Sequence, residues 1–217
     1  MVVKAHWYRR RKKRMHSAMY KLVGAPKTRA FRVLWMLEEL GVAYTVVPTA
    51  PRDPSLTALN PSGKVPILMD GADAIIDSVA ICQYLADKHG RFTFPAGTIK
   101  RGQQDGFTQF AVDDIESGLW TAAKHTFVLP KELRTEDVKK ACRYDFDRAM
   151  SALSQRLGDN DYVMGDAFTV PDLLLGHCGG WARSIGWPLP EGNVTAYFDR
   201  VRLRPAYVKA KAIREAA

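Results

Sequence analysis

The sequence has no apolar run near the ~20 residues that a membrane-spanning helix needs. It also lacks a glycine-rich phosphate-binding loop, a zinc-ligand spacing and a Ser-His-Asp order, so it carries none of the familiar signatures of nucleotide binding, zinc binding or triad hydrolysis. No apolar segment follows the basic residues near the N-terminus, so we expect no signal peptide. With 47% apolar residues, the 217-residue chain is instead expected to bury a sizeable core.

Cysteine is scarce. The chain has three, Cys82, Cys142 and Cys178, and they are far apart in the sequence. None belongs to a C-x-x-C pair, and each lies among apolar neighbours in a helical pattern, so we expect buried thiols. An odd count without disulfide spacing is typical of a reducing compartment, which predicts a cytoplasmic protein.

Acidic residues are missing from the first 18 positions, which carry seven of the 32 basic residues. The rest of the chain holds 25 basic and 23 acidic residues, so the net charge of +9 belongs mainly to this N-terminal stretch. One interpretation is an arm that binds nucleic acid or a membrane surface. The preferred one is a disordered extension that precedes a start at Met15 or Met19.

The stretch over residues 60–78, NPSGKVPILMDGADAIIDS, holds the densest set of local signals. Its first four residues favour a turn, and the apolar run that follows is short enough for a strand. The DG dipeptide then favours a hairpin to a second short strand. Because Pro66 has no N–H to donate, we expect an edge or an interrupted strand there. A cis Val65–Pro66 bond would leave the backbone of Val65 free to pair with an extended peptide.

Asp77 and Ser78 close this stretch and begin an apolar helical run. The N-terminus of a helix presents free N–H groups and a partial positive charge, which suit a carboxylate. The alternative is that either residue only caps the helix.

Taken together, N-P-x-G-K-V-P-I-L and the D-S pair resemble the glutathione-binding half of the soluble glutathione transferases. The resemblance covers nearly everything from Met19 to the C-terminus. It implies an α/β thioredoxin-like N-terminal domain followed by an all-α C-terminal helical domain, and it is closest to the serine/threonine-type, bacterial-like members.

The pattern of apolar residues fits this fold. It predicts strands at 19–23, 42–47, 65–69 and 75–76, with helices at 28–40 and 78–89 and a helical turn at 55–59. Further helices are predicted at 99–123, 136–157, 171–185 and 193–216. We expect four parts: a basic disordered extension at 1–18, a thioredoxin-like glutathione-binding domain at 19–90, a linker at 91–98 and an all-helical domain at 99–217.

Thr169 and Asp172 form a capping-box variant at the start of one of the later helices. This resembles an element of the family's second domain, and we expect its role to be in folding.

The resemblance implies attack of the glutathione thiolate on an electrophile. A free thiol has a pKa of about 8.5, so the protein must favour the thiolate with a hydrogen-bond donor, a helix N-terminus or a cation. In serine-type members the hydroxyl lies two residues after a loop proline and before an arginine, which is the place of Thr28 before Arg29. Thr28 could instead only cap the helix. Tyr20 carries a competing hydroxyl, for which packing is the preferred role.

For glutathione itself, the resemblance implies contacts residue by residue. The backbone at Val65–Pro66 pairs with the cysteinyl part. Asp77, where the family more often has glutamate, and Ser78 hold the γ-glutamyl end. Lys64 and, more weakly, Arg52 are candidates for the glycyl carboxylate, although an exposed, solvated side chain is the alternative for Lys64.

We expect the electrophile between the domains, lined by the helix that carries Phe107, Phe110 and Trp120 and by the later helices. The alternative for these three rings is a place in the core, which is the commoner role of aromatic residues at helical spacing. Core or surface roles are preferred for three other side chains, His125, His177 and Trp181.

We therefore expect a cytoplasmic glutathione transferase that takes glutathione as co-substrate, needs no metal, conjugates an apolar electrophile in detoxification and forms a homodimer. Three alternatives stay open. The first is a glutathione-dependent isomerase, dehalogenase or peroxidase. The second is a non-catalytic protein-interaction module of the same fold. The third, and least favoured, is a nucleic-acid binder that uses the basic arm.

Overall fold

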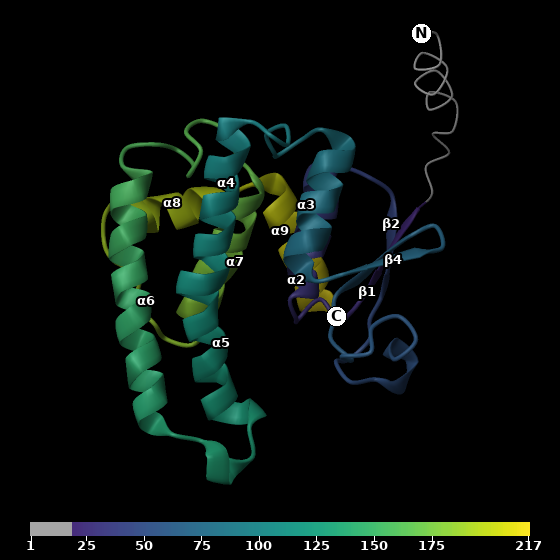
Figure 1. Cartoon of the computed structure of the whole chain (residues 1–217), viewed down its shortest axis with the longest axis horizontal. Helices are drawn as coiled ribbons and strands as arrows, with labels where there is room; N and C mark the ends of the chain where they lie inside the picture. The colour runs from purple at the N-terminus through teal and green to yellow at the C-terminus, as the bar shows by residue number, and fades with distance from the viewer. Residues whose placement is uncertain (1–18) are drawn as a thin grey trace, which may run out of the picture.

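The computed structural model describes residues 19–217, and the expected basic extension lies outside the described residues. Four short strands form one mixed sheet in the order β2-β1-β3-β4 (Figure 1). β1 pairs in parallel with β2 and antiparallel with β3, which in turn pairs antiparallel with β4. This is the predicted thioredoxin-like arrangement. The strands are β1 (Tyr20–Val23), β2 (Tyr44–Val47), β3 (Ile67–Asp70) and β4 (Asp73–Ile76).

Helix α2 (Ala30–Leu40) lies at the centre of the molecule, where it contacts β1, α3 (Ser78–His89) and two helices of the second domain. A helix that is covered on all sides must be apolar all round. The sequence AFRVLWML meets this requirement, with one exception at Arg32, and all eight of its residues are buried.

The stretch between β2 and β3 differs from the predicted element order. A 3₁₀ turn, η2 (Pro54–Leu56), replaces the helical turn expected at 55–59. β3 begins at Ile67 and not at Val65, because Pro66 cannot donate to the ladder. The Val65–Pro66 peptide bond is cis.

The second domain is helical, as predicted. Its first helical stretch is continuous but contains two π-helical segments, one inside it at Ala111–Glu116 and one at its C-terminal end. α5 and α6 pack side by side, whereas α4 and α6 diverge toward the linker (Figure 1). The elements are α4 (Ile99–Phe110), η3 (Ala111–Glu116), α5 (Ser117–Ala123), η4 (Lys124–Val128), η5 (Lys131–Leu133), α6 (Glu136–Leu157), α7 (Val170–Ser184), α8 (Asn193–Arg202) and α9 (Pro205–Ala216).

The prediction of a single helix at 193–216 is wrong. The chain breaks between α8 and α9, where Arg204 is extended at φ −59°, ψ 135°. Pro205 is the cause, since a proline disfavours helical backbone in the residue before it and is itself tolerated at the first position of a new helix.

Buried Asp172 organises the start of α7. One of its oxygens accepts from the Val163 N–H at 3.0 Å and the Tyr197 hydroxyl at 2.9 Å, and the other from the Thr169 N–H at 2.8 Å and the Thr169 hydroxyl at 2.9 Å. Burial raises the pKa of Asp172 to about 6, against the opposing effect of these four donors. The carboxylate thus joins the start of α7, the preceding loop and α8.

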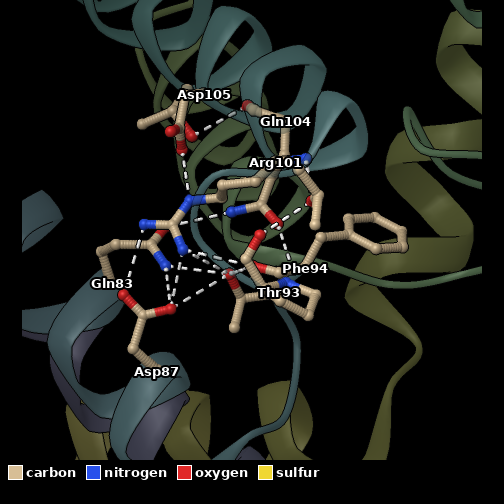
Figure 2. Close-up of polar contacts among 10 residues, drawn as sticks. Gln83, Asp87, Thr93, Phe94, Arg101, Gln104 and Asp105 are labelled. Atoms are coloured by element: carbon tan, nitrogen blue, oxygen red, sulfur yellow. Dashed lines mark hydrogen bonds and ion pairs between the residues drawn. The ribbon is translucent and has the colours of Figure 1, made fainter.

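A polar network fixes the linker between the domains (Figure 2). Arg101 of α4 pairs with Asp87 of α3 at 2.8 Å. Gln104, which is fully buried, donates to the Gln83 side chain and accepts from the Phe94 N–H, each at 3.0 Å. Gln83 of α3 donates to the Thr93 hydroxyl at 2.9 Å, so both domains contribute hydrogen bonds to the same turn of chain.

All three thiols are buried and free, as expected. Across residues 19–217, no helix is both long enough and apolar enough to cross a membrane. The same part of the chain gathers no three His, Cys, Asp or Glu side chains that could hold a metal ion.

Candidate active site

The backbone of Val65 forms an open edge beside the sheet. Among the residues that the structure describes, neither its N–H nor its C=O takes part in a hydrogen bond. Asn60, which is 4% exposed, holds the preceding turn: its side-chain amide donates to the Lys64 carbonyl at 2.8 Å. The turn residues of the NPSG segment thus keep one unpaired donor and one unpaired acceptor available to an extended ligand.

The loop that carries Thr28 lies directly against this edge. Gly24 has φ +139°, and a Cβ placed there would lie 3.0 Å from the Val65 Cβ and 3.1 Å from the Ala30 Cβ. Such distances are tighter than nine in ten real Cβ contacts, and L side chains rarely adopt this φ, so both the approach of the two chain segments and the backbone conformation favour glycine.

The Thr28 hydroxyl closes the start of α2. It donates to the Ala25 carbonyl at 2.7 Å and accepts from the Ala30 N–H at 3.2 Å. Its single hydrogen is therefore engaged inside the loop, and donation to a ligand sulfur requires the hydroxyl to turn away from Ala25.

Asp77 and Ser78 form the start of α3, as predicted. Asp77 has a positive φ of 72°, and its carboxylate caps the helix by accepting from the Val79 N–H at 2.9 Å and the Ala80 N–H at 3.2 Å. The Ser78 N–H has no partner among the described residues, and Ser78 is 3% exposed. A positive φ in a non-glycine residue is costly and tends to occur at functional sites.

Three charged side chains connect the Thr28 loop to the second domain. Glu116 pairs with Arg29 and, at 2.8 Å, with Arg32. The Arg32 side chain is 1% exposed and that of Arg29 is 32% exposed. Burial raises the pKa of Glu116, but the two guanidinium groups outweigh it and hold that pKa below its usual value. The cluster therefore carries a net positive charge beside Thr28.

Two indole rings flank Arg29. Its guanidinium carbon lies 4.9 Å from the centre of the Trp120 ring and 5.6 Å from that of Trp181. These contacts place aromatic surface from α5 and α7 next to the loop that carries Thr28. Of the three aromatic residues that were expected to line the electrophile site, only Trp120 lies next to this loop.

Phe107 and Phe110 instead pack under Arg156, whose guanidinium carbon lies 3.9 and 4.7 Å from their ring centres. Phe107 lines a separate hollow of about 520 Å³ between α4 and the end of α6. These two rings therefore pack within the helical domain and do not lie beside Arg29.

The remaining candidates are placed as follows. Lys64 and Arg52 are both exposed, and the Arg52 N–H donates to the Gly63 carbonyl at 2.7 Å, which keeps the two residues on neighbouring turns. Tyr20 is 4% exposed and its hydroxyl hydrogen-bonds to His89 at 3.0 Å, away from the loop. His125 accepts from the Thr135 N–H.

Arg32 and Glu116 are not among the site residues predicted from the sequence. Arg32 interrupts an otherwise apolar helix, and a charge in a helix that is buried all round needs a counterion. This signal predicts that an acidic partner exists, but not which of the 23 acidic residues it is.

Comparisons with known proteins find relatives for both domains. Residues 22–93 match the N-terminal domain of the glutathione S-transferases, and residues 119–205 match the C-terminal domain. Glutathione S-transferase 4 of Zea mays is 43% identical over 81% of this chain and 83% of its own length. Glutathione S-transferase 3 of the same plant is 26% identical, over 90% and 94%. A theta-class enzyme from Xanthomonas axonopodis pv. citri, solved with glutathione bound, is 25% identical with a TM-score of 0.75, over 89% and 97%.

Proposed function

The chain belongs to the cytosolic glutathione S-transferase family and is a glutathione transferase, and from this premise we propose how it holds and activates glutathione. The tripeptide lies along Val65, with its cysteinyl part on the free backbone groups of that residue. Asp77 and Ser78 hold its γ-glutamyl end, with the Ser78 hydroxyl and N–H donating to the carboxylate, and its glycyl carboxylate is near Lys64 and Arg52. The observation that carries this proposal is the unpaired backbone edge at Val65 together with the Ser78 N–H, which has no partner among the described residues at the start of α3.

The sulfur then lies near Thr28. The Thr28 hydroxyl breaks its hydrogen bond to the Ala25 carbonyl and donates to the thiolate instead. Arg29 and the start of α2 supply positive potential. A donor and a nearby positive charge both lower a thiol pKa, so more of the bound glutathione is ionised at neutral pH. The electrophile approaches from the side of Trp120 and Trp181.

Several finer features are part of the same proposal. The chain is a serine/threonine-type, bacterial-like member that works as a cytoplasmic homodimer in detoxification and uses no metal. Its parts divide at residues 18, 90 and 98. Isomerase, dehalogenase and peroxidase activities share the same glutathione site, and nothing in the geometry favours them over conjugation.

Retention on immobilised glutathione tests the binding site. We expect the wild-type protein to be retained and the Ser78→Ala variant to bind at least about tenfold more weakly, because a hydrogen bond to a charged group is worth roughly 1.5–3 kcal/mol. Ser151→Ala, an exposed serine on α6, is the control and should bind as the wild type does. A wild-type protein that is not retained would favour the protein-interaction module.

Activation of the thiol is tested at Thr28. We expect Thr28→Ala to lower kcat/KM for glutathione conjugation of a chlorodinitrobenzene at least tenfold, about 1.4 kcal/mol of transition-state stabilisation. Thr28→Ser keeps the hydroxyl and should retain most of the activity. The pH profile of kcat/KM should also move to higher pH in Thr28→Ala, because the sulfur loses a donor. Equal rates for wild type and Thr28→Ala would remove Thr28 from the mechanism.

A further inference from the structure

Among the residues the structure describes, Arg32, at 1% exposure, is the most deeply buried charged residue near the candidate site. Its Nη1 donates to the Ser78 Oγ at 3.3 Å, its Nη2 pairs with Glu116 at 2.8 Å, and its Nε donates to His177 Nδ1 at 3.2 Å. One side chain of α2 therefore joins the start of α3 to η3 and α7 of the helical domain.

These contacts fix the direction of the Ser78 hydroxyl. A serine hydroxyl has one hydrogen to donate and two lone pairs that accept, whereas a guanidinium only donates. The Arg32 N–H groups can therefore reach only the lone pairs of Oγ. The hydroxyl hydrogen must be used elsewhere, and the Ser78 Oγ makes no other hydrogen bond within residues 19–217.

The guanidinium is in turn held by groups that accept its hydrogen bonds. Glu116 is ionised, and burial together with the charges of Arg32 and Arg29 lowers the pKa of His177 well below its usual value, so the imidazole stays neutral and accepts through Nδ1. Nη2 also lies 3.6 Å from the buried Cys178 thiol. Because Glu116 and His177 of the helical domain hold its guanidinium group, Arg32 cannot turn away from Ser78.

We propose that Arg32 is a positioning residue for glutathione: held by Glu116 and His177, it keeps the Ser78 hydroxyl as a donor aimed at the γ-glutamyl carboxylate. At 1% exposure Arg32 does not touch the ligand itself. The inference rests on the proposed glutathione site and adds that the helical domain determines how strongly this one carboxylate is bound.

The test compares three thiols by titration calorimetry. They are glutathione, γ-glutamylcysteine without the glycyl residue, and 4-aminobutyryl-cysteinylglycine, which lacks only the γ-glutamyl α-carboxylate. In Arg32→Lys a single ammonium replaces the planar fork and cannot serve Ser78, Glu116 and His177 together. We expect Kd to rise about tenfold for glutathione and γ-glutamylcysteine and to stay unchanged for the thiol without the α-carboxylate.

A double-mutant comparison ties the effect to the hydroxyl. If Arg32 acts through Ser78, Arg32→Lys should weaken glutathione binding less than about twofold further in a Ser78→Ala background, because residues that share one interaction are not additive. Arg204→Lys is the matched control: this partly buried arginine also pairs with a buried glutamate on α2, Glu39, at 2.6 Å, but contacts neither Ser78 nor the site. It should leave all three affinities unchanged.

The possible outcomes separate the hypotheses. Equal weakening of all three thiols by Arg32→Lys would mean that Arg32 only supports the fold, and unchanged affinities would mean that it plays no part. Either result overturns the inference.

If Arg32→Lys does not fold, Glu116→Asp is the second variant. It keeps the negative charge but shortens the side chain that holds the Arg32 guanidinium. We then expect the same weaker binding of glutathione and γ-glutamylcysteine, with no change for the thiol that lacks the α-carboxylate. If a folded Glu116→Asp variant keeps the wild-type ratio of the Kd for glutathione to the Kd for that thiol, the inference is overturned. A wild-type protein that binds none of the thiols would remove the proposed function itself.

Discussion

Replacing Asp172 with alanine is expected to lower the free energy of unfolding by about 4 kcal/mol, because buried donors that lose their acceptor pay their full desolvation cost. Four donors converge on this fully buried carboxylate, two from backbone N–H groups and two from the hydroxyls of Thr169 and Tyr197. None of them has a second acceptor within the described residues. Equilibrium unfolding in urea at neutral pH measures the loss. Asp137→Ala, exposed near the start of α6, is the control and should change stability by less than about 1 kcal/mol.

The pH dependence of the same site has a definite sign. Because the folded pKa of Asp172, about 6, lies above its ordinary 3.8, ionisation costs more in the folded state. Its contribution to stability therefore falls as the pH rises from about 3.8 to about 6 and is constant above that. Asp172→Asn lacks this titration and should be less stable than the wild type throughout, by a margin that shrinks as the pH rises through this range. A margin that grows would show that the four hydrogen bonds outweigh burial.

Glu116→Gln is expected to cost about 3 kcal/mol of stability, the effect of leaving a buried charge without its partner. The variant keeps the size of the side chain but removes the counter-charge from Arg32, which cannot reach water, and from Arg29. Glu136→Gln is the control: it removes an exposed pair with Lys139 and should change stability by no more than about 0.5 kcal/mol. The double variant Arg32→Met, Glu116→Leu should recover most of the loss, because apolar replacement of a buried ion pair is nearly neutral.

The sign of the pH effect is opposite to that at Asp172. The folded pKa of Glu116 is held below its ordinary 4.5, so its contribution is fully present above that pH and is lost as the pH falls through the folded value. Wild type and Glu116→Gln should therefore differ by a constant amount at neutral pH and converge in acid. A difference that persists unchanged in acid would mean that Glu116 acts through its shape and hydrogen bonds and not through its charge.

Local chemistry explains what could be predicted from the sequence. A proline such as Pro66 interrupts a strand because it has no N–H to donate. The NPSG segment forms its turn largely from its own side chains. Asp77 and Ser78 start a helix, and Thr169 begins another, because capping involves residues only a few positions apart. These rules hold without knowledge of the rest of the fold.

The electrophile side could not be predicted in the same way. Glu116 lies 87 residues from Arg29, and no periodic pattern connects them. Phe107 and Phe110 precede Trp120 on the same helical stretch, and at about 1.5 Å of rise per residue they lie roughly 15–20 Å from it along the axis. Only Trp120 is therefore level with Arg29, and the π-helical turn η3 lies between it and the two phenylalanines.

This π-helical turn also restricts which changes of length the chain can accept. Each residue of an α-helix turns the chain by about 100°, so the loss or gain of one residue between 111 and 115 would rotate α5 by about that angle relative to α4. Glu116 would leave the two guanidinium groups, and Trp120 would leave Arg29. Related chains that keep this ion-pair cluster can therefore vary the side chains of η3 freely at its exposed positions, but must conserve its number of residues.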